Sequence, residues 1–181
     1  MSRKLLAAAA LALMFAAPAF AADSDNLQLF RAVQKQVLQY PHFTIFDNVD
    51  VQVNDGAVSL TGKVTMPYKR EDIEKRILKV AGVNRVDNHL DVLPVSQFDD
   101  ELRLRIARSI YGNANFWNYG IMPNPPIHIV VEHGRVTLTG VVQSEVDRAL
   151  ARSLATQFGA LSVTNALKTD AEMRDALEKS E

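Results

Sequence analysis

The sequence contains one motif twice, and this repeat is the strongest constraint on the fold. Residues 51–64 read VQVNDGAVSLTGKV, and residues 129–142 read IVVEHGRVTLTGVV. Downstream, the segment 81–90 is repeated at 158–167, with a shift that is one residue shorter. A repeat unit of this length with a single small gap indicates a duplicated domain rather than a solenoid. We therefore expect two similar modules in tandem.

The N-terminus is typical of a secretory signal peptide. Arg3 and Lys4 precede an apolar stretch, 5–16, that is far shorter than the ~20 residues needed to span a bilayer. Residues 19–21 read AFA, which fits the small-x-small pattern of a cleavage site. We expect residues 1–21 to be removed on export to the periplasm, and we expect no transmembrane span in the mature chain.

Composition narrows the class of protein further. The chain has 181 residues, so each mature module would hold roughly 70, near the lower limit for a self-sufficient core. Small exported domains often rely on disulfides, but cysteine is absent, and the two modules are therefore expected to support each other. Loss of Arg3 and Lys4 changes the net charge from −1 to −3, which does not favour nucleic acid binding.

The first module is predicted over residues 25–93 with the element order α-β-β-α-β. Asp25 is a suitable N-cap for a helix whose apolar residues recur at helical spacing. Alternating apolar runs on both sides of Asp55-Gly56 predict a β-hairpin, because that dipeptide accepts the positive φ angles of a tight turn. A second helix is expected to end at Gly82, before a third strand.

The second module is predicted over residues 97–168 with the same element order. Ser96 followed by Asp99 resembles a capping box at the start of its first helix. The linker 93–97 is short and contains a proline, so the modules are expected to lie in contact or nearly so. A charged tail, 169–181, follows. The predicted fold class is α+β, with two helices covering one face of a small three-stranded sheet in each module.

The repeated motif resembles the BON domain. A hairpin with two glycines is followed by a helix, a third glycine and a strand that carries an asparagine. The matching residues are Gly56, Val58, Leu60, Gly62, Gly82, Val86 and Asn88 in the first module, and Gly134, Val136, Leu138, Gly140, Gly159, Val163 and Asn165 in the second. Together the two matches cover roughly residues 26–168.

The resemblance implies an α/β sandwich without catalytic activity and a role in envelope integrity, commonly ascribed to phospholipid binding. Two such domains behind a signal peptide are similar to osmotically inducible periplasmic proteins. The chain departs from the lipoprotein members of the family because it has no cysteine to acylate.

The residues themselves offer no catalytic or metal-binding constellation. Without cysteine there is no thiolate nucleophile, and neither a G-x-S-x-G motif nor a phosphate-binding glycine loop occurs. The four histidines lack metal-ligand spacing, and no two glycines are three residues apart, which argues against a G-x-x-G RNA clamp. We therefore expect a non-enzymatic protein with no cofactor and no metal.

The shared residues other than the turn glycines admit structural interpretations. Gly62 and Gly140 would allow a helix to approach the sheet. Asn88 and Asn165 share strand parity with apolar residues. They would form either a paired polar site or, as we favour, buried amides that satisfy backbone groups of a neighbouring loop.

The two copies differ most in the connection between first helix and first strand. In the second module this connection, 111–126, is longer, aromatic and holds the one tryptophan. Amphipathic aromatic rings favour a bilayer interface, and arginines beside them can pair with anionic head groups. The candidate membrane- or partner-binding residues of this region are Arg103, Arg105, Arg108, Phe116, Trp117, Tyr119 and Ile121, with Met122 beside them.

Two alternatives remain open for this region. The aromatic side chains could fold back onto the small core or fill the seam between the modules. The region, or a sheet edge, could instead bind envelope proteins, as in a periplasmic adaptor or chaperone-like module. The leading hypothesis is a periplasmic envelope-maintenance or stress protein that binds anionic phospholipid surfaces through its second module.

Overall fold

A computed structural model of the chain describes residues 19–178, and the first module has the predicted element order. Most of the predicted signal peptide and the last residues of the tail lie outside the described residues. The elements are α1 (Ala19–Leu38), β1 (Asn48–Asn54), β2 (Ala57–Val64), α2 (Pro67–Ile77) and β3 (Arg85–Val92). The prediction that Asp25 caps the first helix is wrong. α1 begins earlier, because the alanine-rich residues before Asp25 favour helix without a cap.

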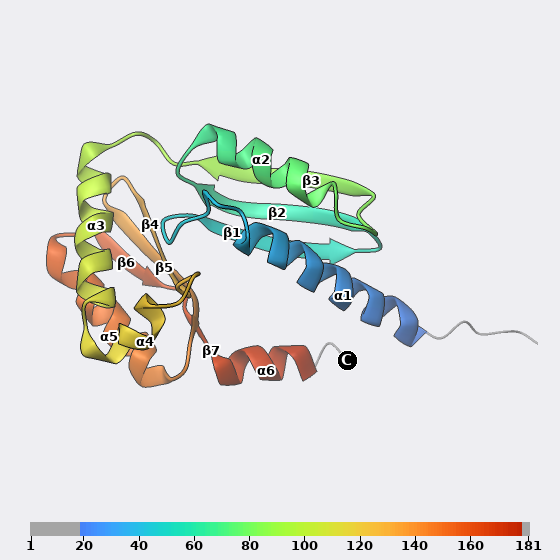
Figure 1. The fold of residues 1–181 in the computed structure, drawn as a ribbon. Helices are drawn as coiled ribbons and strands as arrows, with labels where there is room; N and C mark the ends of the chain where they lie inside the picture. The colour runs from blue at the N-terminus through green and yellow to red at the C-terminus, as the bar shows by residue number, and fades with distance from the viewer. Residues whose placement is uncertain (1–18, 179–181) are drawn as a thin grey trace, which may run out of the picture.

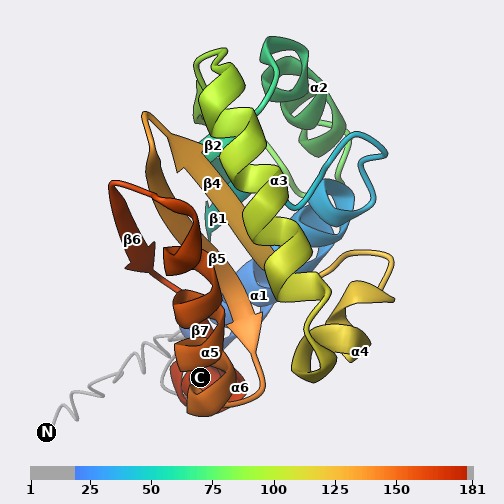
Figure 2. The same ribbon diagram turned by 90° about the vertical axis from the view of Figure 1, so that its left-hand side faces the viewer.

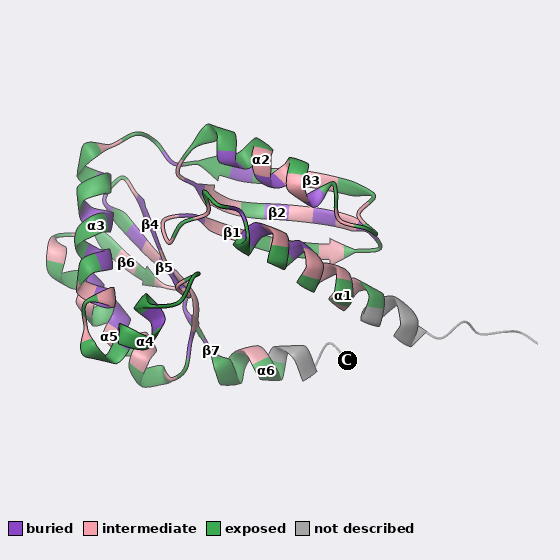
Figure 3. Ribbon diagram, in the orientation of Figure 1, coloured by how far each residue is buried: buried purple, intermediate pink, exposed green. Residues whose placement is uncertain are grey.

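The second module repeats this order with additions. Its main elements are α3 (Gln97–Tyr111), α4 (Trp117–Gly120), β4 (Ile127–Glu132), β5 (Arg135–Val142), α5 (Glu145–Ala155), β6 (Ser162–Asn165), β7 (Lys168–Thr169) and α6 (Asp170–Glu178), with short 3₁₀ turns at Ala114–Phe116 and Thr156–Phe158. Ser96 caps α3 as the sequence predicts, since its hydroxyl accepts the Asp99 N–H at 3.2 Å. The charged tail contributes α6, whose residues 170–175 show no buried band (Figure 3).

Each sheet is an antiparallel hairpin with a parallel third strand. β1 pairs with β2 and β3 lies parallel to β2 on its other side. In the second module β6 and β7 both pair with β5 in a single parallel register, so they are one third strand that is broken for two residues. The second sheet is therefore counted as four strands rather than the predicted three. Both hairpin turns have positive φ, at Asp55-Gly56 and at His133-Gly134, as a type I′ turn requires.

Two helices cover one face of each sheet and enclose a separate core. α1 and α2 lie on the first sheet, and α3 and α5 lie on the second (Figures 1 and 2). The first core includes the fully buried Val33, Leu60, Ile73, Ile77 and Leu90, and the second includes Leu102, Ile106, Ile110, Ile127, Ile129 and Leu138. The α+β layer fold predicted from the repeat is confirmed.

Gly62 and Gly140 do not serve helix packing, and that expectation is wrong. Their φ angles are +121° and +112°, in the region that favours glycine. A Cβ at Gly62 would collide with the carbonyl oxygen of Asn48, and a Cβ at Gly140 with that of Pro126. Each glycine therefore allows the chain that enters the neighbouring strand to pass close to the backbone.

The modules contact each other through residues 43–48 of the first module, here called the bridging segment. Its Ile45 and Phe46 side chains pack against the core of the second module. The Ile129 N–H of β4 donates to the Ile45 carbonyl at 2.7 Å, so the segment covers the edge of β4. The second module thus completes its core with residues of the first, as expected for two small units without disulfides.

Polar contacts fix the same seam. They join His128 Nδ1 to the Asp47 carbonyl oxygen (2.6 Å) and Thr139 Oγ1 to Asn48 Oδ1 (2.8 Å), and they include an ion pair between Lys63 and Glu132. Burial lowers the pKa of His128, so the imidazole is neutral at neutral pH and donates its Nδ1 proton to the carbonyl.

Asp47 holds the bridging segment in the first module. Its fully buried carboxylate accepts hydrogen bonds from the N–H and hydroxyl of Thr44 (2.8 and 2.7 Å) and of Thr65 (2.7 and 2.9 Å). The buried Lys69 ammonium lies 2.7 Å from the same carboxylate. Burial raises the pKa of the Asp47 carboxyl, but the bonds from Lys69, Thr65 and Thr44 outweigh it and leave the pKa below its ordinary value.

Candidate functional site

The aromatic connection after α3 is a compact turn with an inner and an outer side. Phe116 is fully buried, and Tyr119 is only 5% exposed. Their rings stack with centroids 5.8 Å apart, and the Tyr119 hydroxyl accepts the Gln143 N–H at 2.8 Å. Trp117 is 64% exposed and Ile121 is 67% exposed. The connection therefore exposes the large apolar side chains of Trp117 and Ile121, while the buried Phe116 and Tyr119 fix its backbone to the core of the module.

The same geometry removes three residues from the predicted binding set. Phe116 and Tyr119 complete the second core, which is the alternative that the sequence left open. Arg103 is buried because it faces β4 and the bridging segment. Its guanidinium donates to the Val131 carbonyl at 3.3 Å, pairs with Asp100 at 3.2 Å and lies over the Phe46 ring. None of the three can contact a membrane or a partner in this structure.

The other two predicted arginines lie on the exposed face of α3. Arg105 pairs with Glu101 one helical turn earlier, at 3.5 Å, so its charge is partly balanced. Arg108 lies in the last turn of α3, next to the aromatic connection, and it forms no ion pair within the described residues. A cation is favourable there, because the C-terminal end of a helix carries partial negative charge.

A further apolar residue, which the sequence reading missed, lies at the same end of the module. Val146 is 72% exposed in the first turn of α5. The hydrogen bond from the Gln143 N–H to the Tyr119 hydroxyl places α4 near this turn. We call Trp117, Ile121, Met122 and Val146 the apolar tip. Val146 aligns with Tyr68 in the repeat and both side chains are exposed, but the sequence alone does not show that exposure.

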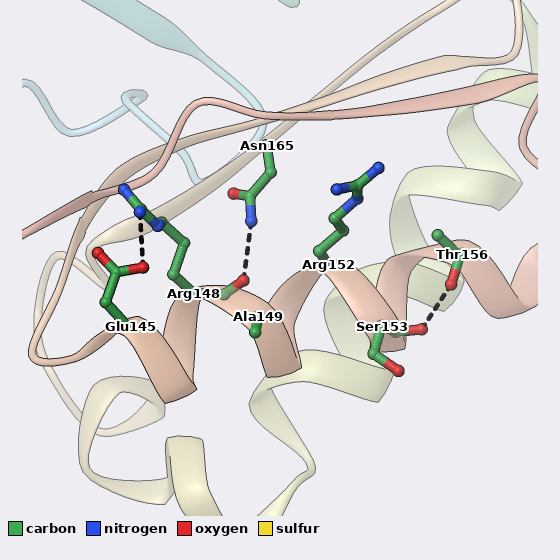
Figure 4. Close-up of a pocket in the computed structure, with 7 residues that line it drawn as sticks. All are labelled: Glu145, Arg148, Ala149, Arg152, Ser153, Thr156 and Asn165. Carbon is green, nitrogen blue, oxygen red and sulfur yellow. Dashed lines mark hydrogen bonds and ion pairs between the residues drawn. The ribbon is translucent and has the colours of Figure 1, made fainter.

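A shallow groove of about 400 Å³ runs along α5 beside β6 (Figure 4). Arg148 and Arg152 line it with Asn165. Arg148 is already paired with Glu145 at 2.6 Å and with Glu172 at 3.0 Å. The groove therefore holds little net positive charge, and it is a weaker candidate for an anion than its arginines suggest.

Asn88 and Asn165 fasten helix to strand in the two modules. Asn88 Nδ2 donates to the Arg70 carbonyl at 3.0 Å, and Asn165 Nδ2 donates to the Arg148 carbonyl at 2.8 Å. Each side-chain oxygen accepts the backbone N–H of the residue two positions later in the chain. The amides are thus occupied mainly by backbone groups, and Asn88 Nδ2 also donates to Glu74 at 2.9 Å. They are half-buried and their carbonyl partners belong to helices, so the prediction of buried amides that satisfy a loop is wrong in these two points.

The described residues show no metal-binding cluster. Within residues 19–178, no three or more histidine, aspartate or glutamate side chains cluster closely enough to hold a metal ion. Burial raises the pKa of Tyr119, which acts here as a packing and hydrogen-bonding group. No helix in this part of the chain is both long and apolar enough to cross a bilayer.

Comparison with known proteins gives the family. The model of the BON domain matches residues 25–94 and 99–171, and the chain therefore belongs to the BON-domain family. BON domains are linked to periplasmic or membrane-associated roles and are generally non-enzymatic.

Two of the solved structures that are similar to the chain are of the same protein. One is the C-terminal domain of CdsD, "the structural protein of the Type III secretion system of Chlamydia trachomatis", with 18% identity over 84% of this chain and 70% of that chain and a TM-score of 0.34. A second structure of CdsD has 14% identity over 84% and 68% of the two chains and a TM-score of 0.31. A sequence comparison with curated proteins found no match.

Proposed function

We propose that this protein is a non-enzymatic periplasmic component of envelope maintenance under osmotic stress, and that it binds anionic phospholipid surfaces through its second BON domain. The observation that carries the proposal is the exposure of Trp117 and Ile121 on a turn that Phe116 and Tyr119 anchor. A rigid base matters, because the side chains lose little conformational freedom when they enter the interface.

The chemistry of the tip fits a membrane interface. Tryptophan favours the headgroup level of a bilayer, where its ring is half apolar and half polar. Arg105 and Arg108 lie on the adjoining helix, and each cation near an anionic surface contributes on the order of 1 kcal/mol. A few apolar side chains with one or two cations support reversible attachment rather than permanent anchoring.

A protein partner is the second candidate function, and one observation favours it. Phe98 and Leu161 are exposed and lie beside Gly134 at the hairpin turn. Phe98 is at the start of α3, whereas the apolar tip adjoins its end. Two separate apolar surfaces at opposite ends of one helix suit an adaptor or chaperone-like module that binds more than a membrane.

Vesicle sedimentation tests the membrane proposal. Wild type is expected to pellet with phosphatidylglycerol-containing vesicles and to remain in the supernatant with phosphatidylcholine vesicles. Trp117→Ala and Ile121→Ala should each lower the bound fraction several-fold. Phe98→Ala is the matched control, since it removes an exposed aromatic ring from the other end of α3. Equal partitioning of wild type and both tip variants would contradict the proposal, and so would loss of binding in Phe98→Ala alone, because the lipid would then contact the other end of α3.

A further inference from the structure

The contact between the modules shows how this fold covers the edge of its first strand. The bridging segment of the first module lies along β4 of the second module, where the Ile45 carbonyl accepts the Ile129 N–H. Ile45 and Phe46 close the space between β4 and α3. With that cover in place, the core-facing side chains of β4 are fully buried.

Among the described residues, no segment covers the equivalent edge in the first module. Val51 pairs with Leu60 as Ile129 pairs with Leu138, so the Val51 N–H points away from β2. Within residues 19–178, β1 pairs with β2 alone. The core-facing Val49, Val51 and Val53 are only half-buried, in contrast to the fully buried side chains of β4.

Helix α1, which lies beside this edge, adds an aromatic side chain to its surface. Phe30 precedes the buried Val33 by three residues, as Arg103 precedes the buried Ile106. Phe30 therefore occupies the place of Arg103, and it is half-buried. We call Phe30 and the three β1 valines (Val49, Val51 and Val53) the open edge. It combines a half-exposed aromatic and aliphatic surface with an unpaired strand backbone, the two features that the bridging segment satisfies on β4.

The second module carries a segment at the position of the bridging segment. At the repeat shift of 78 residues the bridging segment, 43–48, corresponds to residues 121–126 in the connection that leads into β4. Ile121 and Met122 lie at the start of this segment, two positions before the counterparts of Ile45 and Phe46. Ile45 and Phe46 are half-buried, and they pack against the core of the neighbouring module. Ile121 and Met122, in contrast, are 67% and 42% exposed.

We propose that the open edge of one copy binds the Ile121–Met122 segment of a second copy, so that the protein assembles head to tail. The interface repeats between molecules the contact that the two modules make within one molecule. Each copy then offers one acceptor and one donor, and such a heterologous contact builds rings or open chains rather than a closed symmetric pair. Ile121 also belongs to the apolar tip, so a docked copy cannot insert it into a membrane.

Analytical ultracentrifugation of the full-length protein tests this assembly. The weight-average mass of wild type should rise with concentration, and the shift should persist at high salt because the contact is apolar. Phe30→Glu removes the acceptor and Ile121→Asp removes the donor, so each variant alone should stay monomeric. An equimolar mixture should form a species of twice the monomer mass and nothing larger, since only one productive contact remains.

Three results would overturn the proposal. Wild type could remain monomeric over the whole concentration series, a single variant could still self-associate, or the mixture could fail to pair. Circular dichroism checks that Phe30→Glu folds, and Val53→Lys on the same edge is the second acceptor variant. Phe30→Glu should still bind anionic vesicles, so failure of assembly and failure of the membrane proposal are distinguishable.

Discussion

Replacement of Asp47 should destabilise both modules. The Asp47→Ala substitution leaves the buried Lys69 ammonium without its partner and removes the acceptor of the Thr44 and Thr65 N–H groups. Removal of one partner of a buried ion pair costs about 3–5 kcal/mol. The stability of a whole domain is about 5–15 kcal/mol, so this single change should remove a large part of it.

Urea denaturation at neutral pH measures the effect. Asp87→Ala is the control, because Asp87 forms an exposed pair with Arg85 at 2.9 Å and its loss should cost less than about 1 kcal/mol. The double variant Asp47→Ala/Lys69→Met should be more stable than Asp47→Ala, since it no longer buries an unpaired charge. A loss below about 1 kcal/mol in Asp47→Ala would refute the role given to this carboxylate.

The same variant has a pH signature. The folded state lowers the pKa of Asp47, so its contribution to stability is fully present above the unfolded-state pKa of about 3.9. That contribution is lost as the pH falls through the lower folded-state value. Asp47→Ala should therefore lose less stability than wild type on acidification below about pH 4.

Two further predictions concern the second hairpin. Asp99→Ala removes a buried carboxylate that accepts the His133 and Gly134 N–H groups at 2.8 and 2.7 Å, and urea denaturation should show a loss of about 2–3 kcal/mol. Asn26 is the counterpart of Asp99 in the first module and accepts one exposed hydrogen bond, from the Asp55 N–H. Asn26→Ala should therefore cost less than about 1 kcal/mol, and an equal loss of stability in the two variants would contradict this account. Gly140→Ala, at φ +112°, should lower the Tm by at least about 4 °C in a thermal melt; an unchanged Tm would show that the backbone tolerates a side chain there.

The sequence was a good guide where a local pattern has one physical solution. Asp55-Gly56 between alternating runs permits little besides a tight hairpin, and Ser96 before an apolar helical pattern marks a helix start. The prediction that Asp25 caps the first helix failed for a simple reason. A cap signal states where a helix can begin, but the preceding alanines also favour helix and extend α1 beyond it.

The candidate site was harder to predict, because the apolar residues of the aromatic connection do not recur at helical or strand spacing. Without a period, the sequence does not show that Phe116 and Tyr119 turn inward while Trp117 turns outward. Arg103 looks like an exposed helix residue until the bridging segment is placed against it. Asp47 carries no pattern at all, since its partners lie elsewhere in the chain and meet only in the folded protein.

Fluorescence of Trp117 tests the central claim most directly, because it is the one tryptophan in the chain and is 64% exposed. Titration with phosphatidylglycerol-containing vesicles should shift its emission to shorter wavelength, and lipids with brominated acyl chains should quench it. Phosphatidylcholine vesicles should leave the spectrum unchanged. If the emission is neither shifted nor quenched at any concentration of the anionic lipid, the apolar tip does not enter a membrane surface and the account is wrong.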